Sequence, residues 1–256
     1  VEQYSRVVDG VAEFAISLPG YTASQFPLTL TAEMPGVLNE QTGTADLWEN
    51  IDLLADEYRR VKLISLWSSA GNALYMRDVA VDSPDDLEGL KIRVPSRNAG
   101  LVIEAWGATP VSMPVTEIYN AMQTGVLQAA NTSSSSFVSY RIYEQVACYT
   151  PAGDYALWFM YQPLLMNKST FDGLSEAQQN ALRAAAEKAQ AFYLEEAKKE
   201  DAASAKVFAD AGVQLAEMSA ADFDAWRKLA QETSYKAFVQ EVPDGQALLD
   251  MALAVE

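Results

Sequence analysis

The chain has 256 residues, and 18 Lys and Arg against 35 Asp and Glu give it a formal net charge of −17. Half of the residues are hydrophobic and 21% are charged, which is typical of globular proteins and excludes a disordered or fibrous chain. The strong negative charge disfavours nucleic acids and anionic membrane surfaces as partners, because both are bound through basic surface.

Two residue types that carry much of enzyme and metal chemistry are scarce. The chain has no His, and Cys148 is its only cysteine. Ser-His-Asp and Cys-His catalysis, His-ligated metals and an intrachain disulfide are therefore excluded. We expect Cys148 to be a small buried hydrophobic residue, and we predict no cofactor and no bound metal.

No stretch of the sequence predicts a membrane span or a secretion signal. The longest apolar run, at residues 155–166, is interrupted by Gln162 and Pro163 and falls short of the roughly 20 residues that a spanning helix needs. No basic segment followed by an apolar one opens the chain, so we expect any secretion signal to have been removed.

The first third of the chain predicts two helices and two strands. Gly10 ends the first helix, and Pro19 with Gly20 ends the first strand. The second helix is acidic, with apolar residues spaced along one face. In chain order these elements are expected at residues 1–9, 11–18, 45–60 and 61–67.

The middle of the chain alternates strands with helices. Ser83 followed by Pro84 predicts a capped helix start. Strands and helices then alternate, and Gly107 and Gly125 end the two helices. This alternation predicts an α/β fold with parallel strands and crossover helices. The elements are expected at residues 91–94, 98–106, 111–113 and 116–124.

The last third is predicted to be helical. Ser175 and Gln178 have the spacing of a capping box, and the sequence after them runs to about residue 209 without Gly or Pro. Ser219 with Asp222 opens a further helix, and a short helix is expected at residues 243–254. A single long helix, on the order of 50 Å at 1.5 Å per residue, is therefore the main feature of this part.

Arg93 is the most informative single residue. In a strand at residues 91–94, Ile92 and Val94 face one way and Arg93 faces the other. A guanidinium group can grip a carboxylate through two parallel hydrogen bonds. The alternative is a structural ion pair or a solvated edge, and spacing alone favours that alternative.

Aromatic and small polar residues supply further candidates. Aromatic side chains can line an apolar pocket, although they more often fill cores. Residues 131–136 hold an amide and several hydroxyl groups, which can bond a polar ligand or form a flexible linker. Phe137 and Tyr140 just after them favour an ordered helix start. The aromatic candidates are Tyr21, Trp67, Tyr155, Trp158 and Phe159.

An ordered set of short motifs resembles one protein family. Residues 86–95 read DLEGLKIRVP and resemble the DLKGLKIRVP segment of substrate-binding proteins of TRAP (tripartite ATP-independent periplasmic) transporters. Further pieces follow in the family's order over essentially the whole chain. They are GVAE at 10–13, LPGY at 18–21, FPL at 26–28, GATPV at 107–111, MP at 113–114, EIY at 117–119, QTGV at 123–126 and MNK at 166–168.

The resemblance implies a two-lobed α/β periplasmic-binding-protein fold with a hinge and a long helix spanning both lobes. Domain I is expected at residues 1–70 and 159–198, and domain II at 71–158 and 199–256. The lobes would close on a small organic acid in the periplasm and hand it to the membrane subunits of a TRAP transporter, without catalysis. The Arg of KIRVP grips the ligand carboxylate in this family, so Arg93 is expected to do so here.

The sequence departs from the family in three places. The family opens with further βα units before Gly10, so the chain is expected to lack on the order of 50–60 residues. The family's ligand-contacting Asn falls at Thr132, with Asn131 beside it. The loop at residues 68–75 lacks the second basic residue of many members, which favours a ligand with one carboxylate. Polar contacts are therefore expected from Asn72, Asn131, Thr132 and Ser134.

Two other function classes stay open. A ligand-sensing domain of a receptor would share the fold, and the full gene would then encode a membrane segment or a signalling domain. A lyase or glycosidase would need two carboxylates facing one cleft. Neighbouring acids such as Asp85 and Asp86 point apart on a helix, so no such pair is recognised.

Overall fold

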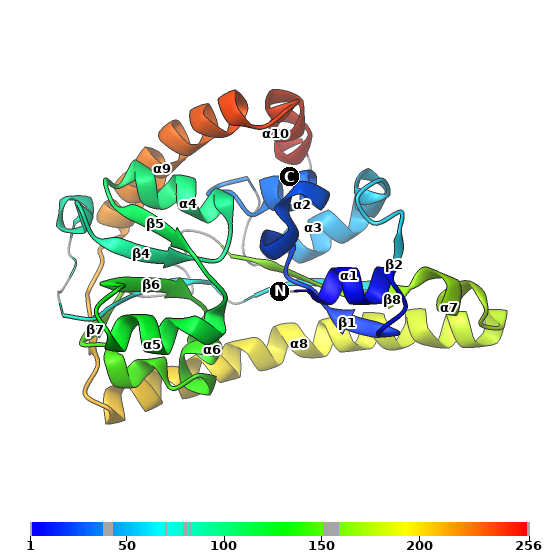
Figure 1. Cartoon of the computed structure of the whole chain (residues 1–256), viewed down its shortest axis with the longest axis horizontal. Helices are drawn as coiled ribbons and strands as arrows, with labels where there is room; N and C mark the ends of the chain where they lie inside the picture. Colours follow the sequence, from blue (N-terminus) through cyan, green and yellow to red (C-terminus); the bar gives the residue numbers. More distant parts are fainter. Residues whose placement is uncertain are drawn as a thin grey trace.

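The computed structural model describes residues 2–37, 43–69, 71–78, 81, 83–150 and 159–254, and these residues form two lobes (Figure 1). The first lobe is built around a three-stranded sheet and the second around a six-stranded sheet. Both lobes mix helices with strands, as the α/β prediction requires.

The first lobe has a small antiparallel sheet. Its order is β1-β8-β2, so β8, which comes late in the chain, lies between two early strands. The strands are β1 (Phe14–Ile16), β2 (Val61–Ser68) and β8 (Tyr161–Asn167). The helices around them are α1 (Gln3–Val8), η1 (Pro19–Gln25), α2 (Pro27–Ala32), α3 (Gly43–Glu49), η2 (Ile51–Leu54) and α7 (Lys168–Asp172).

The second lobe has a mixed sheet in the order β5-β4-β6-β3-β7-β9. Strand β4 is parallel to both of its neighbours, which confirms the crossover pattern expected from the sequence. The strands are β3 (Ala73–Met76), β4 (Lys91–Val94), β5 (Thr109–Ser112), β6 (Ala129–Thr132), β7 (Cys148–Tyr149) and β9 (Gln214–Leu215). The helices are η3 (Pro84–Leu87), α4 (Arg97–Ala105), η4 (Val115–Glu117), α5 (Ile118–Gln123), α6 (Ser134–Ser139) and η5 (Ile142–Gln145).

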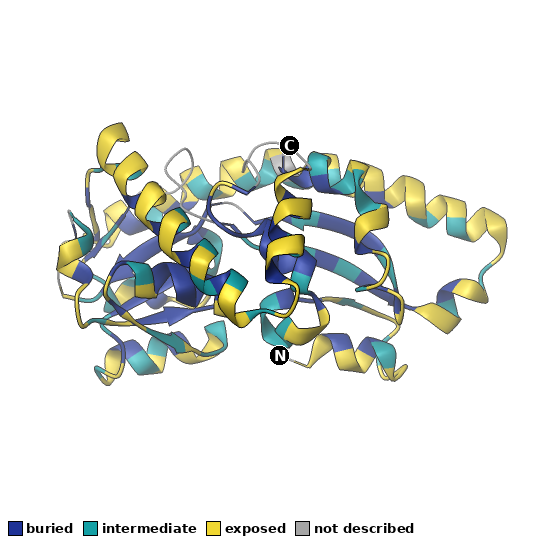
Figure 2. Ribbon diagram, turned by 90° about the horizontal axis from the view of Figure 1, so that it is seen from above, coloured by how far each residue is buried: buried dark blue, intermediate teal, exposed yellow. Residues whose placement is uncertain are grey.

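Three helices in the last third of the chain connect the two lobes. Helix α8 (Glu176–Asp210) runs beneath both lobes in Figure 1 and contacts β2 of the first and α6 of the second. Helix α9 (Ala220–Glu241) packs on α4, and α10 (Gly245–Leu253) returns to pack on α2 of the first lobe. Figure 2 shows the sheets buried and the outer faces of these helices exposed.

The ends of the long helix follow from its sequence. The backbone N–H of Ser175 donates to the side-chain oxygen of Gln178 at 2.9 Å, and the N–H of Gln178 donates to Ser175 Oγ at 3.4 Å. This is the capping box that the sequence predicts. Gly212 follows the helix with a φ of +80°, a conformation that glycine adopts at low cost.

The prediction of one continuous helix at residues 45–60 is wrong about the length of the helix. Helix α3 ends at Glu49 and is followed by the short helix η2. At the break, the side-chain amide of Asn50 donates to the backbone oxygen of Asp46 at 2.8 Å. The same oxygen also accepts the backbone N–H of Asn50 at 3.2 Å, and the N–H of Leu53 then donates to the oxygen of Asn50 at 3.0 Å. The backbone therefore changes to a tighter turn at Asn50, although the amphipathic pattern continues.

Two other sequence expectations are confirmed. The serine run is ordered, because Ser133 precedes helix α6, which begins at Ser134. Cys148 lies buried in β7 next to the core of the second lobe. Its burial matches that of a small hydrophobic residue.

Candidate functional site

Arg93 lies at the centre of the candidate site. Ile92 and Val94, its neighbours in β4, belong to one hydrophobic core of the second lobe. Because side chains alternate along a strand, Arg93 projects from the opposite face of the sheet. Only 1% of its surface is exposed, which is unusual for a charged side chain.

The partners of the Arg93 guanidinium are all neutral. Its Nε donates to the backbone oxygen of Met113 at 2.9 Å, and Nη1 donates to the backbone oxygen of Asn131 at 2.8 Å. Its Nη2 donates to the hydroxyl of Tyr21 at 3.3 Å. No carboxylate among the described residues forms an ion pair with it. Burial lowers the pKa of Arg93, and Tyr21 opposes that shift.

A buried cation without a carboxylate partner has an unmet electrostatic requirement. Removing an ion from water costs several kcal/mol, and neutral acceptors offset only part of that cost. An arginine stays protonated in proteins, so the charge of Arg93 persists at neutral pH. The arrangement can therefore attract an anion, and the fork of Arg93 suits a carboxylate.

Tyr21 brings the first lobe to Arg93. Its hydroxyl also accepts a hydrogen bond from the backbone N–H of Val115 in the second lobe at 3.2 Å. Beside it the chains approach closely, because a Cβ on Gly20 would lie 2.7 Å from Ser96 Cβ and 2.9 Å from the carbonyl oxygen of Pro95. The two lobes are thus in direct contact around Arg93.

The polar candidates on β6 and before β3 lie near the same point. Asn131 is fully buried, and its side-chain amide donates to the backbone oxygen of Ala73 at 3.2 Å. Thr132 is the strand partner of Ala73 and is also buried. Asn72 precedes Ala73 and is 3% exposed, yet neither its amide nitrogen nor its oxygen has a hydrogen-bond partner among the described residues.

Two further candidates contact the long helix. Ser134 donates a hydrogen bond from its hydroxyl to the carboxylate of Asp201 on α8. The ring of Trp67 packs against that of Tyr193 on the same helix, with centroids 5.4 Å apart. Helix α8 therefore contacts candidate residues of both lobes.

Of the other aromatic candidates, only Phe159 lies within the described residues. Tyr155 and Trp158 lie outside the described residues. Phe159 is buried in the core of the first lobe, where its ring meets that of Tyr161 edge-on at 5.5 Å. This position gives Phe159 a packing contact, and its contact with a ligand stays a prediction.

Sequence patterns did not reveal three polar residues that are buried or partly buried. Tyr75 is fully buried, and its hydroxyl has no hydrogen-bond partner among the described residues. Asp201 belongs to a helix rich in exposed acids, and Glu33 belongs to an apolar segment. Nothing in the local pattern distinguishes these side chains from solvated or packing ones, because their burial depends on elements distant in the chain.

Glu33 is the most strongly perturbed of these groups. Burial raises its pKa from 4.5 to about 8, and a hydrogen bond from the backbone N–H of Tyr161 at 2.8 Å opposes the shift. A cavity of about 10 Å³ separates it from Tyr21 and Ser96. The side chain is therefore largely protonated at neutral pH, close to the contact between the lobes.

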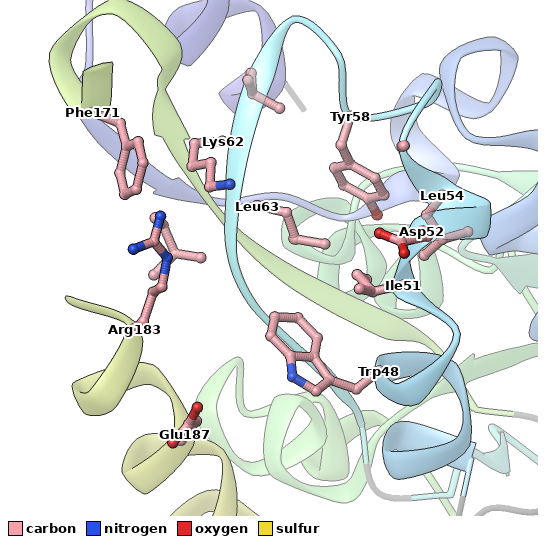
Figure 3. A pocket seen from close by; sticks show the side chains of 13 residues that line it. Trp48, Ile51, Asp52, Leu54, Tyr58, Lys62, Leu63, Phe171, Arg183 and Glu187 are labelled. Carbon is pink, nitrogen blue, oxygen red and sulfur yellow. The ribbon is translucent and has the colours of Figure 1, made fainter. Parts of the chain in front are cut away.

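A larger pocket lies within the first lobe. It has a volume of about 380 Å³ and separates β2 and η2 from α8, and Phe171 and Arg183 face into it (Figure 3). Lys62 and Arg183 both lie over the ring of Phe171, with centroid distances of 5.1 and 5.5 Å. None of the predicted ligand-binding residues lines this pocket.

The described residues contain no cluster of three or more His, Cys, Asp or Glu side chains that would hold a metal ion. Among the described helices, none is both long and apolar enough to cross a membrane.

Two α/β lobes that meet around a buried cation define a two-lobed ligand-binding protein. The comparisons with known proteins agree. The chain belongs to the bacterial extracellular solute-binding proteins of family 7, which it matches over residues 2–241. A solute-binding protein of Albidiferax ferrireducens is 33% identical over 241 residues, covering 92% of this chain and 71% of the relative. A solute-binding protein of Chromohalobacter salexigens is 32% identical, and this chain spans 57% of its length.

Solved structures show the same fold. A TRAP periplasmic solute-binding protein from Rhodoferax ferrireducens with bound malonate is 32% identical, with a TM-score of 0.86, covering 99% of this chain and 81% of that chain. A TRAP periplasmic solute-binding protein from Chromohalobacter salexigens with bound D-glucuronate is 25% identical, with a TM-score of 0.84, covering 99% and 84%. Members of the family are solute-binding proteins and not enzymes.

Proposed function

We propose that this chain is the periplasmic component of a TRAP transporter, that it captures a small organic acid between its lobes, and that it delivers the acid to the membrane subunits. The observation that carries the proposal is the burial of Arg93 among neutral acceptors. A ligand carboxylate would supply the negative charge that the described residues do not bring to this cation.

The relatives support this substrate class. Malonate and D-glucuronate, which are bound in the two solved structures, both carry carboxylates. The lobes differ in what they would contribute, because Arg93 and Asn131 come from the second and Tyr21 from the first. A ligand that touches both would favour the closed arrangement through hinge motion.

The remaining assignments of ligand contacts belong to the same proposal. Arg93 anchors the carboxylate, and Tyr21 orients the guanidinium from the first lobe. Amides and hydroxyls supply the polar contacts, and aromatic rings supply the walls. The polar residues are Asn72, Asn131, Thr132 and Ser134, and the rings are those of Tyr21, Trp67, Tyr155, Trp158 and Phe159.

The decisive experiment is a thermal-shift screen against a carboxylate library, with the matching amides as neutral controls. An acid at 100 times its dissociation constant should stabilise the protein by about 2.7 kcal/mol. Arg93→Ala should lower the affinity for that acid by roughly two to four orders of magnitude, since breaking a buried ion pair costs about 3–5 kcal/mol.

The matched control is Arg227→Ala, because Arg227 is an exposed arginine that pairs with Asp224 at 3.0 Å. Its removal should leave the affinity unchanged. Equal stabilisation by acids and amides, or an Arg93→Ala variant that folds and binds as the wild type does, would overturn the proposal. Recovery of the bound acid chemically unchanged separates binding from turnover.

A further inference from the structure

Two buried polar side chains near Arg93 lack partners within the protein. The amide of Asn72 and the hydroxyl of Tyr75 are both shielded from solvent, and neither forms a hydrogen bond with the described residues. Leaving such groups unpaired is unfavourable, so their presence calls for an explanation. A ligand that bonds them is one explanation, provided that they face the same space as Arg93.

The strand register places Tyr75 on the same side as Arg93. Arg93 of β4 is paired with Ala130 of β6, and Ala130 is paired with Tyr75 of β3. Paired residues of neighbouring strands project from the same face of a sheet. Arg93 and Tyr75 are thus two strand spacings apart, or about 9–10 Å between backbones, and Ala130 is the residue between them in the register.

Asn72 is tied to the same point through the backbone. Asn131 accepts a hydrogen bond from Arg93 with its carbonyl oxygen and donates one from its amide to the carbonyl of Ala73. Asn72 is the residue directly before Ala73. The backbone next to Asn72 and the guanidinium of Arg93 are therefore linked through a single residue of β6.

A carboxylate faces this row from the long helix. Asp201 of α8 accepts a hydrogen bond from Ser134. Ser134 and Phe137 lie one turn apart on α6, and the ring of Phe137 stacks on that of Tyr75 with centroids 3.5 Å apart, so α6 brings Asp201 and Tyr75 to the same region. Burial first, and then the charge of Asp201, raise the pKa of Tyr75 well above its usual value. An ionised carboxylate accepts hydrogen bonds and repels other anions.

We propose that Asn72, Tyr75 and Asp201 form a second recognition point, which binds a hydrogen-bond donor group at the far end of the ligand and rejects a second carboxylate. The inference rests on the proposed function, in which Arg93 holds the ligand carboxylate. The substrates are then monocarboxylates that carry a hydroxyl or amino group, and dicarboxylates such as malonate are poor ligands.

The test uses the whole chain and sets of acids that differ only at the far end. One aliphatic set is butanoate, 4-hydroxybutanoate, 4-aminobutanoate and succinate. One aromatic set is benzoate, 3-hydroxybenzoate, 3-aminobenzoate and isophthalate, and malonate is added. Every binder from the carboxylate library is followed with its own set. Affinities are measured by calorimetric titration on the wild type, Tyr75→Phe, Asp201→Asn and the control Asp210→Asn.

The expected order in each set is donor-bearing acid first, unsubstituted acid at least 10-fold weaker, and dicarboxylate weakest. The hydroxyl and amino members distinguish a neutral donor from a cationic one. Tyr75→Phe should reduce the affinity for the donor-bearing acid toward the affinity for the unsubstituted acid. Asp201→Asn keeps a side chain that can accept the hydrogen bond from Ser134, and it should raise the affinity for the dicarboxylate about 10-fold. Asp210 is an exposed acid of the same helix that pairs with Lys206, so its change should alter nothing.

Several outcomes would overturn the inference. The inference is wrong if the wild-type protein binds the dicarboxylate more tightly than the other acids of its set. This ranking of wild-type affinities is a sufficient test even if a variant fails to fold. An unchanged order of acids in folded Tyr75→Phe and Asp201→Asn has the same consequence. If Arg93→Ala abolishes binding in those cases, the proposed function survives without the second recognition point. No binding by any acid would overturn both.

Discussion

Single buried residues carry most of the functional information in this protein. Arg93 and Glu33 are both titratable and both nearly inaccessible to solvent. Burial disfavours the charged form of both side chains, with different results. Arginine stays charged and needs an anion, whereas a glutamic acid can remain protonated and neutral. The two residues flank Tyr21, which bonds Arg93 and borders the small cavity beside Glu33.

The raised pKa of Glu33 predicts that stability falls as the pH rises. Below pH 4.5 the carboxyl is protonated in both states. Between pH 4.5 and about 8 the unfolded chain releases the proton and the folded chain keeps it, so the free energy of unfolding falls by up to about 1.4 kcal/mol per pH unit. Burial also raises the pKa of Glu57 and of Asp201, which adds to the same direction.

Thermal unfolding from pH 4.5 to 9 measures this loss. Glu33→Gln keeps an acceptor for the N–H of Tyr161 and should flatten the profile above pH 5. The exposed Glu49→Gln in the same lobe is the control and should keep the wild-type slope. A Glu33→Gln profile parallel to that of the wild type would contradict the assignment.

At the scale of elements, the contact between η1 and the chain after β4 decides how closely the lobes approach. Gly20 lies against the backbone of Pro95 and the side chain of Ser96, at a distance that leaves no room for a Cβ. The side chain of Asn98 on α4 also donates to the backbone oxygen of Leu30 on α2 at 2.7 Å. Closure therefore depends on small residues and on backbone groups.

Gly20→Ala is expected to hold the lobes apart. Overpacking costs about 1–3 kcal/mol, so affinity for the acid should fall by roughly 5- to 150-fold. Small-angle scattering should show a larger radius of gyration with ligand than for the wild type. Gly173→Ala is the control, because a Cβ at Gly173 meets its nearest atoms at 3.4 Å. Unaltered scattering and affinity for Gly20→Ala would show that this contact does not limit closure.

At the scale of the whole molecule, the net charge of −17 sets the electrostatics. The ion pairs among the described residues are solvent-exposed pairs such as Lys206 with Asp210, and pairs of this kind contribute little. Repulsion among the excess acidic side chains therefore outweighs the attraction within the exposed ion pairs. Dissolved salt screens this repulsion, with a screening length of about 10 Å at 0.1 M.

Sodium chloride from 0.05 to 0.5 M should accordingly raise the melting temperature. A variant with Glu187, Glu195 and Glu217 changed to Gln removes three exposed acids that form no ion pair with the described residues, and its melting temperature should respond less to salt. Equal melting temperatures at low and high salt, in the wild type, would count against repulsion as a destabilising force.

Local sequence signals predicted the elements that depend on neighbouring residues. The capping box at Ser175 and the alternation around Arg93 depend on residues within four positions, so the helix start and the opposite orientation of Arg93 were predictable. The end of helix α3 at Glu49 was not, because the amphipathic pattern continues past Asn50 while the backbone changes there to the tighter turn of η2. The domain boundaries stay a prediction.

Sequence by itself therefore determined the α/β class, the long helix and the chemical type of the main anchor. Only the tertiary structure decided which polar side chains lose their solvent. Tyr75 and Arg93 share one face of the sheet because β6 lies between β3 and β4, and Asp201 reaches the second lobe because α8 crosses beneath both lobes. Burial depends on contacts between segments distant in the chain, and no local pattern records them.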